Sequence, residues 1–398
     1  MKAFKLLFAL VIGAAVCTPS FANQGYQTPS PALAAVVDAK LAPSSYLSND
    51  GQWLALFDRK RIDTLQDLAK EELKLAGIKL NPANFSRSRV RNKFTSLVLK
   101  HVETGSEIVV SGLPNGILRS PSWSSDSQYL AFVVEQASSA NLWVYNVSTK
   151  QARQLSDTPL NSVLTRTPYT WLPDSSAIVA NAAVNIGKAR ISNDSSQIVP
   201  VIQQSSGEKA PARTYQNLLT SPYDEAQFKF FAQSQLTYIP LSGQGQPIGQ
   251  PGLIKSFSVS PDSTNILVGM IDEPFSYQVP YSRFAATWQI WGMRGYTLAE
   301  LAKQPLADNI PQGYDSVRTG RREFQWRADQ GAEVIWAEAQ DGGDMKTDVP
   351  HHDYLYSLRA PFKRDAKLFA KVERRFDSIT WGNAVSYTHL TLPTIYSV

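Results

Sequence analysis

The sequence predicts an all-β protein built as a β-propeller, because a turn signal recurs along the chain and the strands that follow it are apolar on both faces. An aromatic or aliphatic residue precedes an Asp by three places at Leu47, Trp123, Trp171, Val259 and Trp326. The Asp side chain can accept hydrogen bonds from the backbone groups that follow it, which favours a tight turn. A strand pattern comes directly after each turn.

These strands lack a polar face. Alternate residues of a strand point to opposite sides, and in YLAFVV (129–134) both sets are apolar. The next strand, NLWVYNV (141–147), has the same two-sided character. Such strands must be covered on both faces. Sheets stacked around a propeller axis meet that demand, whereas a two-sheet sandwich leaves one face of each sheet in water and predicts clean alternation.

The spacing of the turn signals sets the expected number of blades. The openings at Trp171 and Val259 are 88 residues apart, and a propeller blade takes roughly 40 to 50 residues. We therefore expect an additional blade around QFKFFAQSQLTYIPL (227–241). Trp381 resembles the start of another. The prediction is about seven blades, the last one incomplete.

Two further segments have helical signals, and one has a hairpin signal. DTLQDLAKEELKLAG (63–77) offers Asp63 or Thr64 as N-cap and Gly77 as its end. TLAEL (297–301) has capping-box spacing but is short enough to be a turn between blades. QDGGDMKTD (340–348) is typical of a long hairpin connection.

The N-terminus is typical of a secretory signal peptide. Two lysines precede an apolar run, Leu6 to Val16, and small residues follow where a signal peptidase requires them. We expect residues 1–22 to be a cleaved signal helix, residues 23–384 to form the propeller, and the mature protein to be periplasmic or secreted. A membrane anchor is the alternative, but it needs roughly 18 apolar residues. No membrane association is therefore expected after cleavage.

The only cysteine, Cys17, lies in that signal, so the mature chain could form no disulfide. Lipidation at Cys17 is disfavoured by Val16, because lipoprotein processing prefers a small residue there. The formal net charge of +5 is too small to indicate a nucleic-acid partner.

Residue patterns for catalysis and metal binding are lacking. His351 and His352 are adjacent, so on an extended segment they point to opposite faces and cannot easily share an ion. No Gly-x-Ser-x-Gly nucleophile turn and no phosphate-binding glycine loop occurs. We expect no catalytic residue, no metal and no cofactor in this chain.

A basic strip is the one local charge cluster. Arg87, Arg89, Arg91 and Lys93 alternate, which on an extended segment places all four on one side. We interpret it as a solvated strand face or loop. An anionic partner is the alternative, although no aromatic residue is interleaved as nucleic-acid stacking would require.

Several stretches, taken in order, resemble one family. They are EKAPARTYQNLLTSPYDEAQFKFFAQSQL, PGLIKSFSVSPD, PFSYQVPYSRF, DSVRTGRREFQWRAD, EAQDGGD and VPHHDYLYSLRAPF. The chain resembles the N-terminal propeller of glutamyl endopeptidases, a branch of the prolyl oligopeptidase family of serine peptidases, over roughly Leu41 to Asn383.

This resemblance implies a secreted two-domain peptidase that cuts after glutamate. Its propeller would gate the access of peptide substrates to a C-terminal α/β-hydrolase domain, which carries the catalytic serine, aspartate and histidine and is expected to be absent here. Within PFSYQVPYSRF, Arg283 with Tyr281 beside it is the candidate substrate-binding pair, because a guanidinium binds carboxylate in two places. The alternative is that Arg283 ties one blade loop to another. Arg318, Arg321 and Arg322 leave the same two possibilities open.

The end of the sequence departs from the family pattern. VSYTHLTLPT (385–394) resembles the in-frame translation of a transposase-based sequencing adaptor. We expect residues 385–398 not to be native, and the recorded chain to be a fragment of a longer peptidase. The alternative for this segment is a last edge strand. The alternative for the whole protein is a non-catalytic periplasmic propeller that acts as an interaction scaffold.

Overall fold

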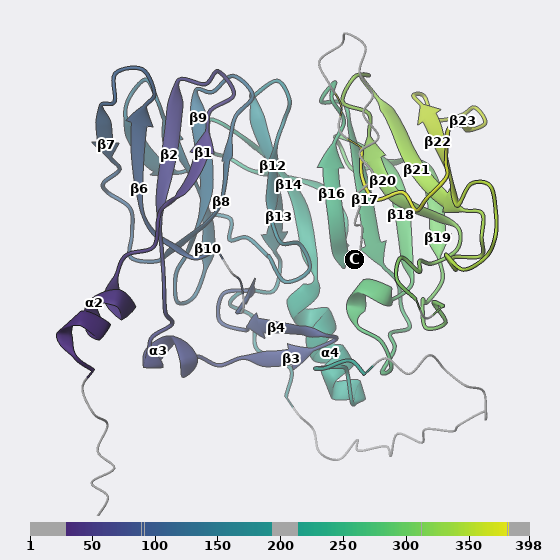
Figure 1. Cartoon of the computed structure of the whole chain (residues 1–398), viewed down its shortest axis with the longest axis horizontal. Coiled ribbons are helices and arrows are strands. Elements are labelled where there is room, and N and C mark those ends of the chain that lie inside the picture. Colours follow the sequence, from purple (N-terminus) through teal and green to yellow (C-terminus); the bar gives the residue numbers. More distant parts are fainter. Residues whose placement is uncertain are drawn as a thin grey trace, which may run out of the picture. The chain divides into compact units, whose positions relative to one another are not determined.

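The computed structural model describes residues 29–88, 90, 92–192, 214–311, 313–379 and 381 (Figure 1). It divides into two compact units, one up to Leu41 and one from Ala42 onward, which are treated separately. The predicted signal peptide, residues 1–22, and the segment 385–398 lie outside the described residues. Among the described residues, no helix has the length and apolarity needed to cross a lipid bilayer.

The first unit contains one helix, α2 (Pro31–Asp38). Its N-cap is Ser30, whose hydroxyl accepts a hydrogen bond from the Leu33 N–H at 3.4 Å, and Pro31 occupies the first turn, where its missing N–H costs nothing. None of the helix residues is buried.

The second unit is built from antiparallel sheets, so the all-β prediction is confirmed. Its strands are β1 (Ser44–Leu47), β2 (Trp53–Arg59), β3 (Leu73–Leu75), β4 (Ile78–Asn81), β5 (Ser86–Arg87), β6 (Phe94–His101), β7 (Glu107–Val109), β8 (Ile117–Trp123), β9 (Tyr129–Glu135), β10 (Ala140–Asn146), β11 (Gln151–Gln154), β12 (Tyr169–Trp171), β13 (Ala177–Ala183), β14 (Ser234–Pro240), β15 (Gln246–Gly252), β16 (Ile254–Val259), β17 (Asn265–Ile271), β18 (Ala286–Gly292), β19 (Thr297–Gln304), β20 (Arg321–Trp326), β21 (Glu333–Ala339), β22 (Asp353–Arg359) and β23 (Lys367–Val372). Its helices are α3 (Leu65–Leu68), α4 (Pro222–Ala232) and the 3-10 helix η2 (Tyr281–Arg283).

Most strands form four-stranded units in chain order, as propeller blades do. We number them sheet 1 (β1, β2, β6, β7), sheet 2 (β8–β11), sheet 3 (β12–β15), sheet 4 (β16–β19) and sheet 5 (β20–β23). Sheets 1 and 2 are joined only through the pair Phe94 and Leu118. The hairpins predicted from the sequence are present, since β9 pairs with β10 and β21 pairs with β22.

The described residues contain five such sheets, fewer than the about seven that the spacing predicts. The segment 227–241 is not a separate blade: it contributes the end of α4 and then β14, which is the third strand of sheet 3. The 88-residue interval between Trp171 and Val259 is long because a segment is inserted between β13 and β14 of sheet 3. Trp381 opens no strand among the described residues, and its ring lies 5.2 Å from the Arg327 guanidinium.

The two predicted helices differ from the structure. Thr64 does cap α3 in a capping box with Asp67, but the helix ends at Leu68 and the remaining residues form the hairpin of β3 and β4. The segment 297–301 lies in β19 and is a strand. In both cases a local helical signal is overridden by strand pairing.

Each turn signal occupies the same place in its sheet. The aromatic or aliphatic residue is the last residue of the first strand, and the Asp lies in the turn to the second strand. Asp50, Asp126 and Asp262 each accept a hydrogen bond from the hydroxyl of the Ser two residues earlier, at 2.5 to 2.6 Å. The repeat found in the sequence is therefore a repeat of one turn.

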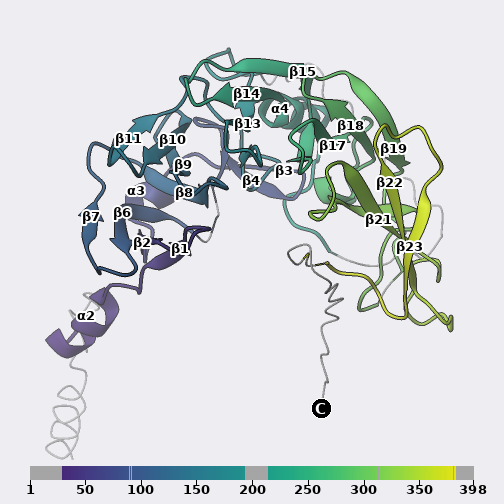
Figure 2. The ribbon, with the colours of Figure 1, turned by 90° about the horizontal axis from the view of Figure 1, so that it is seen from above.

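Three tryptophans, each the last residue of the first strand of its sheet, connect that sheet to the preceding one; we call them the opening tryptophans. The indole N–H of Trp123 donates to the carbonyl of Tyr46 at 3.0 Å, that of Trp171 to Ser122 at 3.1 Å, and that of Trp326 to Ser258 at 3.1 Å. Each acceptor stands one residue before the opening position of the preceding sheet. Val259 has no indole, and here the link is apolar packing between sheets 3 and 4, which lie side by side in Figure 2.

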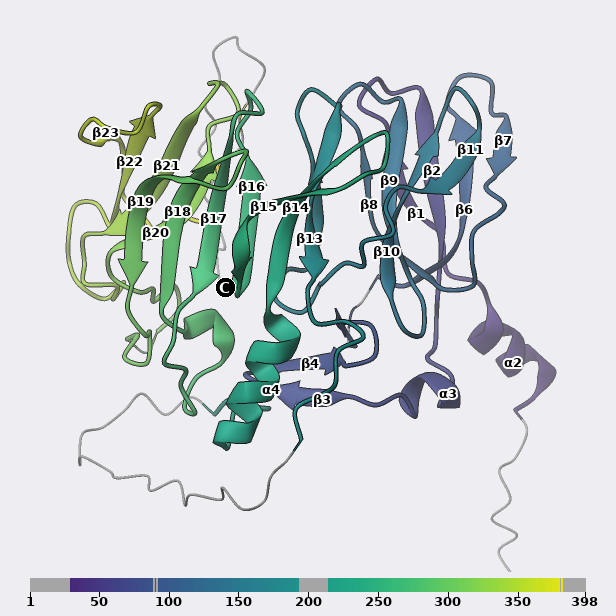
Figure 3. The ribbon, with the colours of Figure 1, turned by 180° about the vertical axis from the view of Figure 1, so that it is seen from behind.

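Apolar clusters fill the spaces between successive sheets, as the two-sided strands require. Sheet 2 packs on sheet 3 through residues such as Leu142 and Ile178, and sheet 4 packs on sheet 5 through Leu267 and Trp336. A separate cluster lies at one end of the sheets, where Phe228 and Phe231 of α4 meet Leu75 of the β3–β4 hairpin (Figure 3).

We predict that Trp171→Phe lowers the free energy of unfolding by about 1 to 3 kcal/mol, because the part-buried hydrogen bond from the buried Trp171 to the Ser122 carbonyl is lost while most of the ring is kept. Urea denaturation measures the change. Trp143→Phe is the matched control, since the Trp143 indole donates no hydrogen bond within the described part of the chain. Equal losses in the two variants would contradict a role for the indole hydrogen bond.

Candidate functional site

The structure places the candidate residue Arg283 beside a pocket of about 410 Å³, which we call the basic pocket. It is lined by Lys255, Ser256, Ser282, Arg283, Trp288, Gln304, Ile310, Val317, Arg318, Arg322, Glu323 and Phe324. Four of these side chains are basic and one is acidic. An excess of positive charge in a pocket of this size suits an anionic side chain.

The second candidate, Tyr281, does not line this pocket. Its hydroxyl accepts a hydrogen bond from the guanidinium of Arg87, which also lies 5.4 Å from the centre of the tyrosine ring. η2 therefore carries Tyr281 toward Arg87 and Arg283 toward the basic pocket. The structure separates the two residues that the sequence suggested as a pair.

Irregular first strands position two of the basic side chains. Lys255 lies where β16 breaks register between Ile254 and Ser256. Arg322 lies at the corresponding break in β20, followed by Glu323 with a left-handed φ of +53°. A bulge redirects a side chain that regular alternation would place elsewhere. Each basic residue stands four places before the last residue of its strand, which is Val259 in β16 and Trp326 in β20.

Neutral oxygens hold Arg318 and Arg283. Arg318 donates to Gln304 Oε1 at 2.9 Å, and the same oxygen accepts from the Trp288 indole at 3.1 Å. Arg283 donates to the Ala307 carbonyl at 3.4 Å and lies 5.5 Å from the centre of the Tyr215 ring. The sequence left open that Arg283 connects one loop to another, and the hydrogen bond to Ala307 is such a contact. Arg283 makes this contact and also lines the basic pocket.

The basic side chains of the pocket disfavour one another's charges. Burial lowers the pKa of Lys255 to about 8, and the nearby positive charge of Arg318 contributes. Burial also lowers the pKa of Arg318, with a further contribution from Arg283. Glu323 acts in the opposite direction on both but does not offset the effect. An added carboxylate would stabilise these charged forms.

Arg322 connects the pocket to a buried ion-pair network. Its guanidinium pairs with Asp353, which also accepts from Arg375 at 2.7 Å. Arg375 continues to Asp341, whose carboxylate lies 2.7 Å from His352 Nδ1. The Nε–H of Arg322 is buried and has no acceptor among the described residues.

This network accounts for one of the two adjacent histidines. His351 instead lies against the ring of Tyr354, with centroids 6.2 Å apart, so the two imidazoles have separate partners. Within the described ranges, no group of three His, Cys, Asp or Glu side chains is placed to hold a metal ion.

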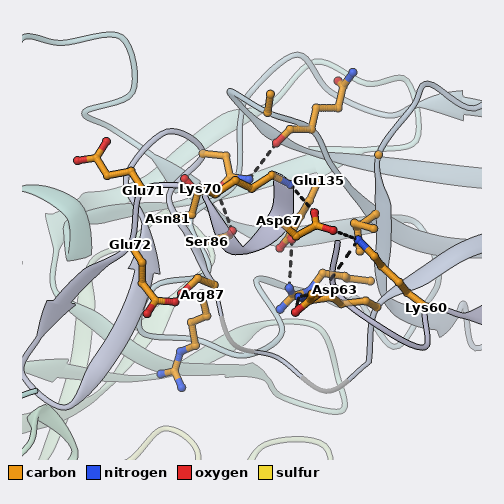
Figure 4. Close-up of a pocket in the computed structure, with 18 of the residues that line it drawn as sticks. Lys60, Asp63, Asp67, Lys70, Glu71, Glu72, Asn81, Ser86, Arg87 and Glu135 are labelled. Carbon is orange, nitrogen blue, oxygen red and sulfur yellow. Dashed lines mark hydrogen bonds and ion pairs between the residues drawn. The ribbon is translucent and has the colours of Figure 1, made fainter. Parts of the chain in front are cut away.

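A second pocket, of about 390 Å³, contains both signs of charge and is shown in Figure 4. We call it the ion-pair pocket. Lys60 pairs with Asp67, Lys93 donates to Asp63 at 2.7 Å, and the buried Arg119 pairs with Glu135 at 3.1 Å. Because Lys60, Lys93 and Arg119 already have carboxylate partners, this pocket is less suited to an added anion than the basic pocket.

The sequence alone did not identify Lys255 as a candidate, and it left two interpretations open for Arg318 and Arg322. A usable signal existed: counting four residues back from the opening residues Trp123, Val259 and Trp326 gives Arg119, Lys255 and Arg322. The alternation of residues along a strand does not identify these positions as cavity-lining. A bulge changes the direction of the side chain, and a period-two pattern does not reveal a bulge.

We predict that Lys255 titrates near pH 8 and that Arg318→Met raises its pKa, because the substitution removes a neighbouring positive charge. NMR of chain labelled with ¹³C at lysine Cε follows the titration, with Lys255→Arg assigning the signal. Arg364→Met, an exposed arginine outside the pocket, is the control. An ordinary lysine pKa in the unsubstituted chain would contradict the crowding of positive charge.

We also predict that Asp353→Ala lowers the free energy of unfolding by about 3 to 5 kcal/mol, because it leaves the buried Arg322 without its carboxylate and Arg375 with only Asp341. Chemical denaturation measures the loss. Asp348→Ala, at an exposed position in the same hairpin connection, should change stability by less than about 0.5 kcal/mol. A small loss at Asp353 would show that the network is not energetically coupled.

The sequence and structure of this chain were compared with those of known proteins. No family model matches the chain. It is 32% identical over 379 residues to a probable chloroplastic glutamyl endopeptidase of Oryza sativa subsp. japonica, covering 91% of this chain and 40% of the relative. It is 30% identical over 383 residues to the probable chloroplastic glutamyl endopeptidase of Arabidopsis thaliana, covering 90% and 38%.

The chain thus spans about two-fifths of the length of the curated relatives it matches. Among solved structures, the acylaminoacyl peptidase of Pyrococcus horikoshii is similar with a TM-score of 0.40 and 14% identity, covering 83% of this chain and 39% of that one. The resemblance found in the sequence is confirmed: over about nine-tenths of its length, this chain is similar to part of two proteins named as probable glutamyl endopeptidases.

Proposed function

We propose that this chain is the propeller portion of a secreted or periplasmic serine peptidase that cleaves peptides after glutamate, and that the basic pocket receives the glutamate side chain. The observation that carries the proposal is the charge of that pocket: Lys255, Arg283 and Arg318 line one cavity, and Glu323 is the one acidic residue among its described lining residues. The relatives, named as glutamyl endopeptidases, support the choice of substrate.

The chemistry of the pocket fits a carboxylate better than other acids of similar charge. Its volume of about 410 Å³ lies at the small end of ligand cavities. Two guanidiniums can each offer paired donors to the planar carboxylate, and the Lys255 ammonium adds a point charge. The ring of Trp288 and the ring of Phe324, 4.9 Å apart, supply an apolar wall for the aliphatic stem of the side chain.

In this proposal the propeller recognises the substrate while the bond is cleaved elsewhere in the full protein. A serine activated by a histidine would attack the peptide carbonyl, and backbone donors would stabilise the resulting oxyanion. Those groups would come from the part of the relatives that this chain does not cover. The propeller would also restrict access to short or unfolded peptides. Secretion is proposed from the signal-like N-terminus.

We predict that the chain binds an acetylated, amidated peptide with one glutamate about 10 to 100 times more tightly than its glutamine counterpart, because one charged hydrogen-bonding group contributes about 1.5 to 3 kcal/mol. Isothermal titration calorimetry at pH 7 measures both. Arg318→Met should remove the preference, and Arg364→Met should retain it. Equal affinity for the two peptides would contradict the proposal.

We predict that the same affinity falls as pH rises from 7 to 9. Lys255 is protonated below its pKa of about 8 and neutral above it, so the pocket loses one positive charge in this window. Calorimetry across the range measures the fall. Lys255→Met should bind more weakly at pH 7 and show no comparable step. A step that survives in Lys255→Met would assign the titration to another group.

A further inference from the structure

A third cavity, of about 910 Å³, has three arginines and no acidic residue among its described lining residues, and we call it the arginine cavity. Its lining consists of Tyr46, Arg87, Val90, Asn92, Phe94, Arg119, Ser120, Pro121, Arg166 and Thr167. Three of these described residues are arginines and none is acidic. The cavity has about twice the volume of the basic pocket.

The first strands of the sheets build this cavity in the way that they build the basic pocket. Arg119 stands four places before the opening residue Trp123, the position that Lys255 and Arg322 hold in β16 and β20. β8 breaks register after Arg119, and Ser120 has a left-handed φ of +50°. The break at this position therefore recurs beside a basic residue in three of the five sheets.

The charge of Arg119 is compensated by Glu135, which lies outside the cavity lining, whereas Arg87 and Arg166 have no carboxylate partner among the described residues. Arg87 donates to the carbonyls of Val163 and Leu164, at 2.9 and 3.0 Å, and to the hydroxyl of Tyr281. Figure 4 shows its guanidinium pointing away from the acidic side chains of the ion-pair pocket that the picture labels.

Arg166 completes the set. It is exposed and makes no hydrogen bond or ion pair with the part of the chain that the structure describes. Its guanidinium is therefore available to a ligand without breaking an existing contact. Asn92 and Thr167 add neutral polar groups, and Val90, Phe94 and Pro121 add apolar surface.

We propose that the arginine cavity binds an acidic peptide segment carrying at least two carboxylates, as a second subsite separate from the basic pocket. Guanidiniums pair with planar carboxylates in a bidentate way, and the apolar lining suits the aliphatic stems of acidic side chains. A volume near the upper end of ligand cavities accommodates several residues, not one side chain. This inference rests on the proposed function only in taking the ligand to be a peptide.

The test compares peptides that differ only in acidic residues outside a single glutamate. One acetylated, amidated peptide carries that glutamate in a Gly-Ser context, a second carries three further glutamates on one side, and a third carries glutamines instead. Calorimetry at pH 7 and 0.15 M salt gives the affinities, since screening at this ionic strength suppresses long-range attraction. We expect the four-glutamate peptide to bind at least tenfold more tightly than the one-glutamate peptide.

Variants assign this gain to the cavity. Arg166→Met should remove most of it, and Arg364→Met, an exposed arginine outside the lining, should retain it. Arg119→Met combined with Glu135→Gln removes two buried charges that already compensate each other, so it should retain most of the gain. Equal effects of Arg166→Met and Arg364→Met would overturn the proposal, because the attraction would then be general.

The two proposals fail in different ways. If the extra glutamates add nothing while the one-glutamate peptide still outcompetes its glutamine form, the second subsite is overturned and the basic pocket stands. If the gain depends on Arg166 but Arg318→Met has no effect on the one-glutamate peptide, the second subsite stands and the basic pocket is overturned. Displacement of the four-glutamate peptide by equimolar inorganic phosphate would overturn a peptide site in favour of a phosphate site.

Discussion

The hydrogen bond from an opening tryptophan to the preceding first strand is the contact on which the arrangement of the sheets depends. A donor at the end of one first strand meets a carbonyl one residue before the end of the preceding first strand, as in the pairs Trp123 with Tyr46 and Trp171 with Ser122. Such a bond has a direction, which apolar packing lacks, so it fixes how far one strand can slide past the other.

Three of the basic residues that line the cavities stand at a fixed place in their strands. Arg119, Lys255 and Arg322 lie at bulges four residues before the last residue of the strand, and in the strands of Arg119 and Arg322 that last residue is an anchored tryptophan. Non-glycine residues with positive φ at the bulges of β8 and β20, Ser120 and Glu323, carry a conformational cost that the surrounding pairing must offset. The same structural device is thus used repeatedly, with a different basic side chain each time.

The ion-pair pocket and the basic pocket differ in whether their basic side chains have carboxylate partners, and this difference decides which of them can bind an added anion. In the ion-pair pocket, Lys60 and Lys93 have acidic partners, and their charges are already compensated. In the basic pocket, burial lowers the pKa of Lys255, and the positive charge of Arg318 lowers it further. Burial of a charge without a partner is costly, so an uncompensated cluster is more informative about ligands than a compensated one.

The sequence by itself determined the all-β class, the position of each turn and the two-sided burial of strands such as β9, because turn chemistry and period-two patterning are local properties. It also located Arg283, through a resemblance extending over most of the chain. Only the tertiary structure decided that 227–241 joins sheet 3 instead of forming a blade, and that the 63–77 segment turns from α3 into a hairpin. It alone separated Tyr281 from Arg283 and brought Lys255, Arg318 and Arg283 to one pocket. The physical reason is that strand partners, bulges and the balance of charge in a cavity depend on residues far apart in the chain, which no local pattern records.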